Sequence, residues 1–379
     1  MGKHVIGISG AGIGGLVAAI ALRRLGKEVV VFEQAARFAR VGADINLTPN
    51  AVAALDGLGV GEALRENAAR PSCRISRTWD TGAETSRLEM SAAAEQRYGS
   101  PQLTMHRADL LSVLESALPP GVVKLGARVN EVVREERIGL RFADGAQEQV
   151  DVLIGADGIH STVRAALFGP EHPTFTGVVA YRAVVPVQRV ADQPVTVANL
   201  DAFTKWWGPN PETQIVTFPL NRGRDVFIFA TTPQDSWRHE SWTTPGSVEE
   251  LRQSYADFHP EARALLDACD SVLKSALYVR DPLPAWSVGN ATLLGDACHP
   301  MMPFMAQGAA MAIEDAVVLA RYLSADATAE TSAVLKAYEG ARLDRTSRIQ
   351  IGSRGNTWLK DSDNADWVYD YDAWTVALS

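Results

Sequence analysis

The stretch Val5-Ile6-Gly7-Ile8-Ser9-Gly10-Ala11-Gly12-Ile13-Gly14-Gly15 decides the fold. Its apolar start predicts a short buried strand over residues 4–9, and the Ala- and Leu-rich residues 14–25 predict a helix that ends at Gly26. The run Val29-Val30-Val31-Phe32 predicts a second strand. A strand, a glycine turn, a helix and a strand form a βαβ unit, so we expect a Rossmann-like α/β fold.

The glycine turn matches G-x-G-x-x-G, the pattern of dinucleotide-binding proteins. Gly10 permits the tight turn, Gly12 lets the backbone approach a pyrophosphate, and Gly15 lets the helix pack close to the sheet. The helix N-terminus adds free N–H groups and a positive dipole end. Glu33 ends the second strand, at the spacing expected for a residue that binds both ribose hydroxyls. Because a carboxylate there would repel a 2′-phosphate, this site disfavours NADP.

Two further motifs favour FAD over NAD, which the glycine turn alone does not separate. Residues 295–300 (Gly-Asp-Ala-Cys-His-Pro) follow a predicted buried strand, and the Asp can hydrogen-bond a polyol chain. Residues 307–310 (Gln-Gly-Ala-Ala) begin a predicted helix, whose dipole would stabilise negative charge on a reduced flavin. Residues 151–158 (Asp-Val-Leu-Ile-Gly-Ala-Asp-Gly) form a strand that ends in an acidic glycine turn.

Composition limits the class of protein. The chain has 379 residues, 46% of them hydrophobic, and its 36 basic and 45 acidic residues give a net charge of −9. An acidic chain has no broad field for nucleic acid or an anionic membrane, so we expect neither partner. The sequence shows no signal peptide and no membrane-spanning run, which predicts a cytoplasmic protein. The three cysteines (Cys73, Cys269 and Cys298) form no metal-like cluster, and we expect no metal.

The order of patterns predicts an interrupted α/β domain. Residues 50–69 and 247–270 are expected to be helical, and residues 122–142 to hold a small group of strands. Alternating β-branched and aromatic residues over 175–235 predict antiparallel strands. We therefore expect a discontinuous FAD-binding domain, an inserted β-rich substrate domain and a C-terminal helical tail. The expected ranges are 1–70, 101–166 and 276–340 for the first, 71–100 and 167–275 for the second, and 341–379 for the third.

Taken in order, the glycine turn with Glu33, the turn at Asp157 and Gly158, and the Gly295-Asp296 motif resemble the single-component (class A) flavoprotein aromatic hydroxylases. Their fold is a Rossmann-like FAD domain with a β-sheet substrate domain, of the p-hydroxybenzoate hydroxylase type. The resemblance implies FAD, with NADH or NADPH and O₂ as co-substrates. It also implies hydroxylation of a small aromatic or N-heteroaromatic acid through a flavin C4a-hydroperoxide, with or without loss of a carboxylate. Within the family the chain is most similar to the hydroxylases of hydroxynicotinate and salicylate.

The resemblance also implies roles for individual residues. Glu33 would bind the adenosine ribose, Val129 the adenine, Arg107 the pyrophosphate region, Asp157 both FAD and the nicotinamide cofactor, and Asp296 the ribityl chain. Pro303 and the residues up to Ala309 would line the reactive face of the flavin. The full set of expected cofactor contacts is Gly10, Gly12, Gly14, Gly15, Glu33, Gln34, Arg40, Arg107, Val129, Asp157, Asp296, Gly308 and Ala309.

Departures from the most similar enzymes fall at the expected substrate pocket. Asn46 and Phe304 each stand where the hydroxynicotinate hydroxylase has a His, and Phe203 stands where it has a Cys. Asn cannot act as a general base near neutral pH, so no catalytic base is assigned and Asn46 and Pro303 are the catalytic candidates. Arg182 is a candidate for pairing with a substrate carboxylate, against an equally supported structural role. The expected substrate contacts are Asn46, Arg182, Phe203, Gln214 and Phe304.

Other readings of the glycine turn remain to be compared. A disulfide reductase would carry a second G-x-G-x-x-G and a redox Cys pair, and this chain has neither. A different FAD-dependent oxidoreductase remains an alternative, as does a non-catalytic dinucleotide sensor, although the chain shows no DNA-binding element. The sequence does not define the oligomeric state, and both a monomer and a homodimer are compatible with it.

Overall fold

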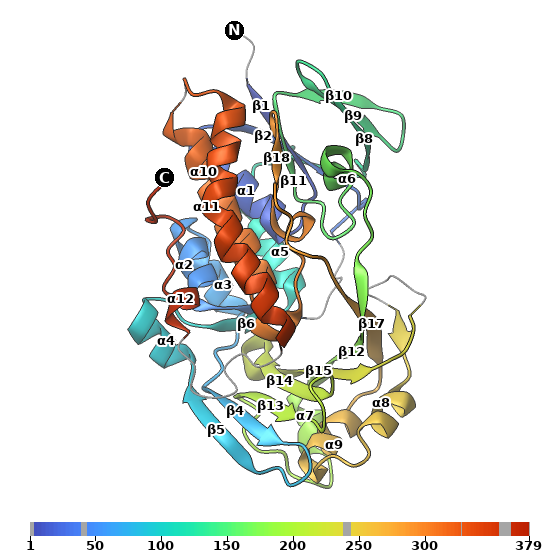
Figure 1. Ribbon diagram of the computed structural model, residues 1–379. Coiled ribbons are helices and arrows are strands. Elements are labelled where there is room, and N and C mark those ends of the chain that lie inside the picture. Colours follow the sequence, from blue (N-terminus) through green and yellow to red (C-terminus); the bar gives the residue numbers. More distant parts are fainter. Residues whose placement is uncertain (1–3, 39–43, 238–243, 327, 356–364, 379) are drawn as a thin grey trace.

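The computed structural model describes residues 4–38, 44–237, 244–326, 328–355 and 365–378. Two large sheets lie at opposite ends of the molecule (Figure 1). The first has six strands, in the order β18 (Ser287–Val288), β19 (Ala291–Leu293), β11 (Val152–Gly155), β1 (Val5–Ser9), β2 (Glu28–Glu33) and β7 (Val123–Leu125). All neighbours pair in parallel except β18 with β19. This is the expected Rossmann-like sheet, with the βαβ unit at its centre.

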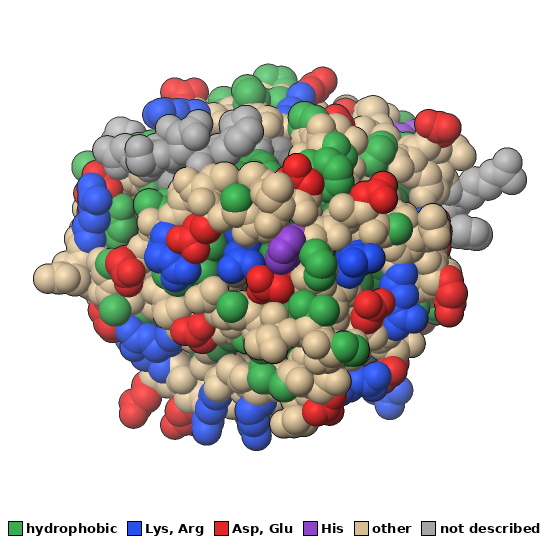
Figure 2. Space-filling view, turned by 90° about the horizontal axis from the view of Figure 1, so that it is seen from below, with side chains coloured by type: hydrophobic (Ala, Val, Ile, Leu, Met, Phe, Trp, Pro, Cys, Tyr) green, Lys and Arg blue, Asp and Glu red, His purple; other side chains and the backbone are tan. Residues whose placement is uncertain are grey.

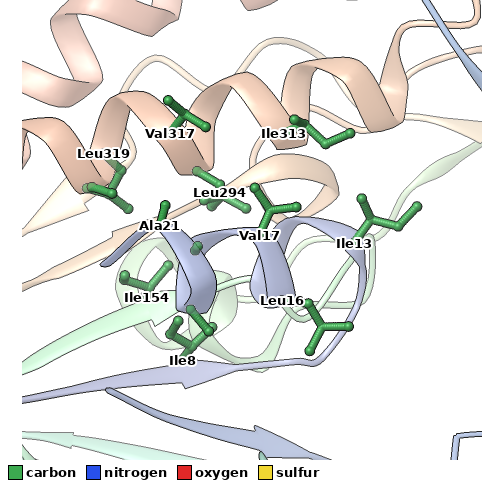
Figure 3. Packing of buried hydrophobic residues seen from close by; sticks show 14 of the residues in the cluster. Ile8, Ile13, Leu16, Val17, Ala21, Ile154, Leu294, Ile313, Val317 and Leu319 are labelled. Carbon is green, nitrogen blue, oxygen red and sulfur yellow. The ribbon is translucent and has the colours of Figure 1, made fainter. Parts of the chain in front are cut away.

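The core of this part joins the two ends of the sequence. Helix α1 (Ile13–Arg24) follows the glycine turn and packs against α10 (Gly308–Ala325). Figure 3 shows Val17 of α1 facing Ile313 and Val317 of α10, with Leu294 between the two helices. All of these side chains are almost completely buried. The sheet is further covered by α5 (Arg107–Ser116) and α11 (Thr331–Gly352) (Figure 1).

The second sheet has eight strands. Their order is β16 (Pro245–Gly246), β17 (Val272–Val279), β12 (Thr174–Pro186), β15 (Asp225–Pro233), β14 (Gln214–Leu220), β13 (Phe203–Trp207), β4 (Cys73–Thr78) and β5 (Glu84–Glu89). All pairs are antiparallel except β13 with β4. The antiparallel strands predicted over 175–235 are therefore present, and the chain adds β4 and β5 from a much earlier segment.

Alternation along these strands divides the sheet into two faces. The outer face packs Trp206, Ile215 and Ile228 against α8 (Val248–Ser254) and α9 (Pro260–Asp267). The inner face carries a second set of apolar residues directed at the rest of the molecule. Seen from the side of α8 and α9, acidic and basic side chains are interspersed, with hydrophobic side chains as scattered spots between them (Figure 2). The outer face is therefore an ordinary solvated surface over a covered sheet.

Smaller elements complete the fold. Strands β8 (Val129–Arg134), β9 (Ile138–Phe142) and β10 (Gln147–Val150) form an antiparallel group, and β3 (Ile45–Leu47) pairs with β6 (Leu103–Met105). Further described helices are α4 (Ser91–Tyr98), α6 (Thr162–Phe168), α7 (Val187–Ala191) and α12 (Asp366–Tyr369), with short 3₁₀ turns between elements. None of the helices in the described part of the chain has both the length and the apolar character that a membrane crossing requires.

Three secondary-structure predictions differ from the structure. The helix expected over 50–69 is two helices, α2 (Pro49–Gly57) and α3 (Gly61–Asn67), because Gly59 turns the chain with a φ of 74°. The helix expected over 247–270 is also interrupted, since Pro260 starts α9 after α8 has ended. The small strand group expected over 122–142 excludes β7, which pairs with β2 in the parallel sheet.

The sheets support the proposed division into a cofactor domain and an inserted substrate domain, with two shifts of boundary. Strand β17 continues to Val279 before the chain returns to the first sheet, beyond the expected boundary at 276. Residue 341 lies inside α11, so we propose that the C-terminal tail starts after Gly352. The described part of this tail is fixed by contacts: Tyr98 donates to Asp366 at 2.7 Å, and Trp374 donates to the carbonyl of Ala54 at 2.9 Å.

Candidate cofactor and substrate site

One cavity of about 1190 Å³ lies between the two large sheets. It extends from the glycine turn after β1 to the inner face of the eight-stranded sheet, and Ala365 and Tyr369 of the C-terminal tail also line it. Pockets for single small molecules commonly measure about 300–1,000 Å³. This cavity is therefore large enough for a dinucleotide together with a one-ring molecule.

Each position of the glycine turn is a glycine for a different structural reason. Gly10 has a φ of 101°, and a Cβ on Gly15 would lie 2.0 Å from the carbonyl oxygen of Gly10. A Cβ on Gly14 would lie 2.5 Å from Leu294, at the contact between α1 and the sheet. A Cβ on Gly12, in contrast, would meet nothing within 4 Å, and Gly12 lines the cavity. Gly10, Gly14 and Gly15 thus make the turn compact, and Gly12 leaves its backbone open to a ligand.

The start of α1 offers hydrogen-bond donors to the cavity. The N-cap residue of α1 is Gly12, which has no side chain to accept from the first N–H groups of the helix, and the first turn contains no acidic residue. Glu33, at the end of β2, accepts from the backbone N–H groups of Ala11 and Ala35, both at 2.8 Å. These bonds hold the carboxylate at the cavity wall, where Gln34 also lies. A helix start beside a fixed carboxylate suits a pyrophosphate next to a ribose.

Asp157 supports the second acidic turn. Its carboxylate accepts from the Ser161 hydroxyl and from the first backbone N–H groups of α6, at 2.9 Å from Thr162 N and 3.2 Å from Val163 N. Burial raises the pKa of Asp157, and these hydrogen bonds oppose that rise. Asp157 lines the cavity while it anchors α6, so it both shapes the turn and carries charge beside the site.

Three other expected cofactor residues come together from distant elements. Asp296 lies in the turn after β19, Arg107 opens α5 and Val129 begins β8, and all three line the cavity. Burial within the site raises the pKa of Asp296, against the positive charges of His299 and Arg107. The residues expected to bind the ribityl, pyrophosphate and adenine groups thus line one cavity.

The loop before α10 is a strained segment that faces the cavity. Pro303 starts a short 3₁₀ turn, and Ala306 follows with a φ of 54°, a left-handed conformation that costs free energy for a residue with a Cβ. Gly308 and Ala309 then begin α10, whose first turn has neither a side-chain cap nor an acidic residue. The helix therefore presents its positive end to the cavity.

Buried side chains hold that loop in place. The Gln307 side chain donates to the Thr48 hydroxyl at 2.9 Å, and Asn50 donates to Gln307 at 3.1 Å and to Glu314 at 2.7 Å. All four residues are less than 1% exposed. These contacts tie the start of α10 to the start of α2, and hence to β3, which immediately precedes it.

A buried ion network lies behind the loop. Arg342 bonds Asp315 at 2.8 Å and Glu314 at 2.7 Å, and His299 bonds Asp315 at 2.5 Å. Burial alone would lower the pKa of His299, but the charge of Asp315 raises it. Cys298 lies near this pair, yet Arg342 already supplies the positive charge that a metal ion would bring to Asp315. His299 therefore serves the architecture behind the cavity.

The inner face of the eight-stranded sheet forms the opposite wall. Phe203 and Phe218 stack with ring centroids 5.4 Å apart, and Phe218 also contacts Phe227 at 5.0 Å. Phe304 packs against this group from the loop before α10. The wall residues that line the cavity include Arg74, Arg182, Phe203, Lys205, Gln214, Val216, Phe218, Phe227, Phe229, Leu273, Ser275 and Leu277. Such a wall fits a flat aromatic ring.

Polar members of the substrate set have defined surroundings. Asn46 is buried and accepts a hydrogen bond from the Gln102 side chain at 2.7 Å. Arg182 donates to the Ser275 hydroxyl and lies over the Phe229 ring, 5.2 Å from its centroid. Gln214 is 1% exposed. Trp206 lies in the core of the outer face.

Asp44 is a cavity residue that the sequence did not single out. Burial raises its pKa to about 6, although the positive charges of Arg182 and Arg107 act in the opposite direction. Burial also lowers the pKa of Arg182 to about 10, against the charge of Asp44. The charges of Asp44, which precedes β3, and of Arg182 in the eight-stranded sheet therefore act on each other.

The structure gathers nearly all of the expected residues. Every expected cofactor and substrate residue lines the cavity except Gly15, which lies behind it, and Arg40, which is outside the described residues. Residues that the sequence did not indicate include Arg74, Lys205 and Tyr369. Lys205 was recognisable from alternation, since it lies two residues from Phe203 on β13, whereas Arg74 shares that face only through the pairing of β13 with β4.

The cavity fits FAD on the structure's own evidence. The open side of Gly12, the fixed carboxylate of Glu33 and the uncapped starts of α1 and α10 match a ribose, a pyrophosphate and an electron-accepting ring. The second wall leaves apolar space beyond these groups for another ring. The fold and site therefore define a dinucleotide-binding flavoprotein with a separate aromatic subsite.

The chain belongs to the FAD binding domain family, whose sequence model matches residues 3–351. It is 39% identical to a 6-hydroxynicotinate 3-monooxygenase of Bordetella bronchiseptica, over 100% of this chain and 97% of that one. It is 38% identical to the 3-amino-4-hydroxybenzoate 2-monooxygenase PtnB3 of Streptomyces platensis, over 92% and 86%. A salicylate hydroxylase in complex with its substrate superposes with a TM-score of 0.83 and 27% identity, over 98% and 96%.

These relatives confirm the class A flavoprotein hydroxylase resemblance and the expected fold. The protein is a flavoprotein aromatic-ring monooxygenase with FAD as its cofactor and NAD(P)H as its co-substrate.

Proposed function

We propose that this protein hydroxylates a one-ring aromatic or N-heteroaromatic acid of the hydroxynicotinate, salicylate or hydroxybenzoate type. The observation that carries the proposal is the single cavity that joins the cofactor-binding turn to the phenylalanine wall. The three relatives described above are named for substrates that combine one ring, a hydroxyl group and a carboxylate. A ring with a hydroxyl or amino group is electron-rich, as oxygen transfer to carbon requires.

The reaction balances with the co-substrates of the class. One oxygen atom of O₂ ends on the ring, the other ends in water, and NAD(P)H supplies two electrons. FAD, when bound, carries those electrons to O₂ and transfers the oxygen atom. The cofactor contacts we propose are Gly10, Gly12, Gly14, Glu33, Gln34, Arg107, Val129, Asp157, Asp296, Gly308 and Ala309, with Gly15 setting the turn.

The protein's own contribution is position and exclusion of water. The stacked pair Phe203 and Phe218 holds the substrate ring flat, and Phe304 closes the wall from the α10 loop. The positive end of α10, which follows the same loop, would stabilise negative charge on the bound, reduced flavin. Pro303 and Ala306 fix the loop between ring and helix. Asn46, held by Gln102, positions the substrate and does not take its proton.

We place the reaction in the cytoplasm, where NAD(P)H is supplied, and the three buried free cysteines accord with a reducing compartment.

An assay of NADH and NADPH oxidation with the FAD-loaded protein tests the proposal. The panel contains salicylate, hydroxybenzoates, aminobenzoates and hydroxylated pyridine carboxylates, with product, CO₂ and H₂O₂ all quantified. We expect one group of acids to accelerate NAD(P)H oxidation and to yield hydroxylated product with little H₂O₂. NAD(P)H oxidation that yields H₂O₂ alone for every acid in the panel would reject the proposed substrate class. The CO₂ measurement separates simple from decarboxylative hydroxylation.

A further inference from the structure

The C-terminal tail supplies part of the cavity wall, although it follows both large sheets in the sequence. Ala365 and Tyr369 of the tail line the cavity together with Ala93, Ala94 and Tyr98 of α4. Figure 1 shows the short helix α12 of the tail beside α4, where Tyr98 donates a hydrogen bond to the first residue of α12. This part of the wall therefore comes from two helices and from neither large sheet.

Tyr369 stands next to the phenylalanine wall of the substrate half. Arg74 of β4 lies over the Phe203 ring, 5.4 Å from its centroid. Burial lowers the pKa of Arg74, and the Tyr369 phenol opposes that fall, so these two side chains are neighbours. On its other side the Tyr369 ring meets the Tyr98 ring edge-on, with centroids 5.7 Å apart. A row of side chains thus runs from Phe203 through Arg74 and Tyr369 to Tyr98.

Hydrogen bonds on both sides of Tyr369 hold the tail in place. Before it, Asp366 accepts from the Tyr98 hydroxyl at 2.7 Å. After it, the carbonyl of Ala373 accepts from Arg321 of α10 at 2.8 Å. The chain is tied to α4 at one of these points and to α10 at the other, so the Tyr369 ring between them keeps a defined place in the cavity wall.

The tail is also linked to the loop that starts α10. Arg345 of α11 donates to the carbonyls of Trp367 and Val368, at 2.7 and 2.8 Å. The same guanidinium donates twice to the buried carboxylate of Glu314 in α10, both times at 2.9 Å. Glu314 in turn accepts from Asn50, which also bonds the residue before α10. The tail and the α10 loop are therefore held through one carboxylate, and a ring bound between them has a limited space.

We propose that the C-terminal tail forms one end of the substrate pocket, and that Tyr369 sets the size of the ring system that the pocket accepts. A one-ring acid fits between the phenylalanine wall and the Tyr369 ring, whereas a fused second ring would need the space that Tyr369 occupies. The inference rests on the proposed function for the identity of the substrate as an aromatic acid. It adds to the phenylalanine wall a specificity residue from outside both sheets.

Binding of matched one-ring and two-ring acids tests this inference without turnover. The FAD-loaded protein is titrated with salicylate against 3-hydroxy-2-naphthoate and with nicotinate against quinoline-3-carboxylate, and the flavin absorbance reports each Kd. We expect the parent to bind the one-ring acid of a pair about tenfold more tightly or better. Tyr369→Ala should abolish or reverse this preference, because an apolar cavity of about 150 Å³ already holds a benzene molecule. Tyr369→Phe keeps the ring and should keep the preference.

Two further variants make the result specific. Trp367 lies two residues earlier on α12, with the Arg348 guanidinium 3.8 Å from its ring centroid, and it is not part of the cavity wall. Trp367→Ala therefore controls for the removal of a large aromatic side chain from the tail and should keep the one-ring preference. If Tyr369→Ala loses FAD, Tyr369→Leu takes its place, with the same expected direction. An unchanged preference in the Tyr369 variant, or an equal change in Trp367→Ala, would overturn the inference.

Product analysis separates this inference from the proposed function. A size preference that depends on Tyr369, without hydroxylation of any acid, would reject the proposed function and keep the inference. Hydroxylation of one-ring and two-ring acids equally well by the parent would keep the hydroxylase function and overturn the inference. Failure of the parent to bind any of these acids would overturn both.

Discussion

The cofactor half of the cavity is made from backbone turns and helix starts, whereas the substrate half is made from side chains on one face of a sheet. In the first half a glycine carbonyl lies where a Cβ of Gly15 would have to go. In the second half, phenylalanines and two buried cations stand on strands whose backbones are regular. A backbone site tolerates few residue types, and a side-chain wall can change its residues while its strands stay in place. The comparison implies that the backbone fold determines which cofactor binds, whereas the side chains on the inner face of the sheet determine which substrate binds.

The largest expected effect is that of Gly15→Ala in the cofactor half, which should lower both stability and FAD retention. Its Cβ would lie 2.0 Å from the Gly10 carbonyl oxygen, so the turn must open, which we expect to cost about 3 kcal/mol of the free energy of unfolding. FAD retention, measured from the ratio of absorbance at the flavin and protein bands, should be lost. Gly12→Ala, with open space around its Cβ, should keep the stability and weaken FAD binding alone.

Gly340→Ala serves as the control for this pair. Gly340 lies inside α11 with nothing within 4 Å of its Cβ position, so the change should stabilise the protein by about 0.4–1 kcal/mol and leave FAD bound. Urea unfolding measures all three variants. A Gly15→Ala protein with parental stability and full flavin content would show that the turn is not the rigid element we describe.

A change in the substrate half should have a smaller and different effect. Phe203→Leu removes the ring that stacks on Phe218, and we expect about a tenfold rise in KM for the best aromatic acid, equivalent to about 1.4 kcal/mol. Flavin content should stay at the parental level, because Phe203 contacts the substrate wall and no element of the glycine turn. Steady-state kinetics and flavin content measure the two effects. Loss of FAD together with activity would mean that the two halves are not separable.

The smallest expected effect tests the contact between the halves. Burial raises the pKa of Asp44 from 3.8 to about 6, so between these values the folded protein binds a proton more tightly than the unfolded chain. The free energy of unfolding therefore falls as the pH rises through this window. Asp44→Asn should be more stable than the parent above about pH 6. The gain is at most about 1 kcal/mol, since the side chain is partly exposed and water screens its charge.

Thermal unfolding of the flavin-free protein across this pH range measures the Asp44 effect. The difference between Asp44→Asn and the parent should vanish below the unfolded value of 3.8, where both states carry a proton. A variant less stable than the parent at neutral pH would show that attraction to Arg182 outweighs the cost of burial.

The same contrast explains what could be predicted from the sequence. Gly10, Gly12 and Gly15 were predictable because their requirement is local: a turn, a close approach and a helix contact within six residues. Glu33 and Asp296 were found from their places at strand ends, and the structure brings both to the cavity. The expected helices are split at Gly59 and Pro260. Gly and Pro commonly end helices, so both breaks could have been predicted from the sequence.

The substrate wall was harder to predict because it depends on pairings between distant strands. Lys205 and Arg74 belong to one face only because β13 pairs with β4 in parallel, and no local pattern gives that register. Burial raises the pKa of Asp44, and the charge of Arg182, which lies more than a hundred residues away in the sequence, opposes that rise. Strand β7 was grouped with its sequence neighbours, and its pairing with β2 again required knowledge of the fold.

The contact between α1 and α10 has a consequence for how the protein is made. Val17 packs against Val317, which is synthesised about 300 residues later (Figure 3). In the first sheet β11 lies between β1 and β19, so the sheet is incomplete until residues near 293 have been synthesised. At about 5–20 residues per second, the amino-terminal βαβ unit spends about 15–60 s on the ribosome with its apolar helix uncovered. Ribosome pausing or a chaperone that covers α1 during that interval would then control the yield of folded protein, long before any flavin is bound.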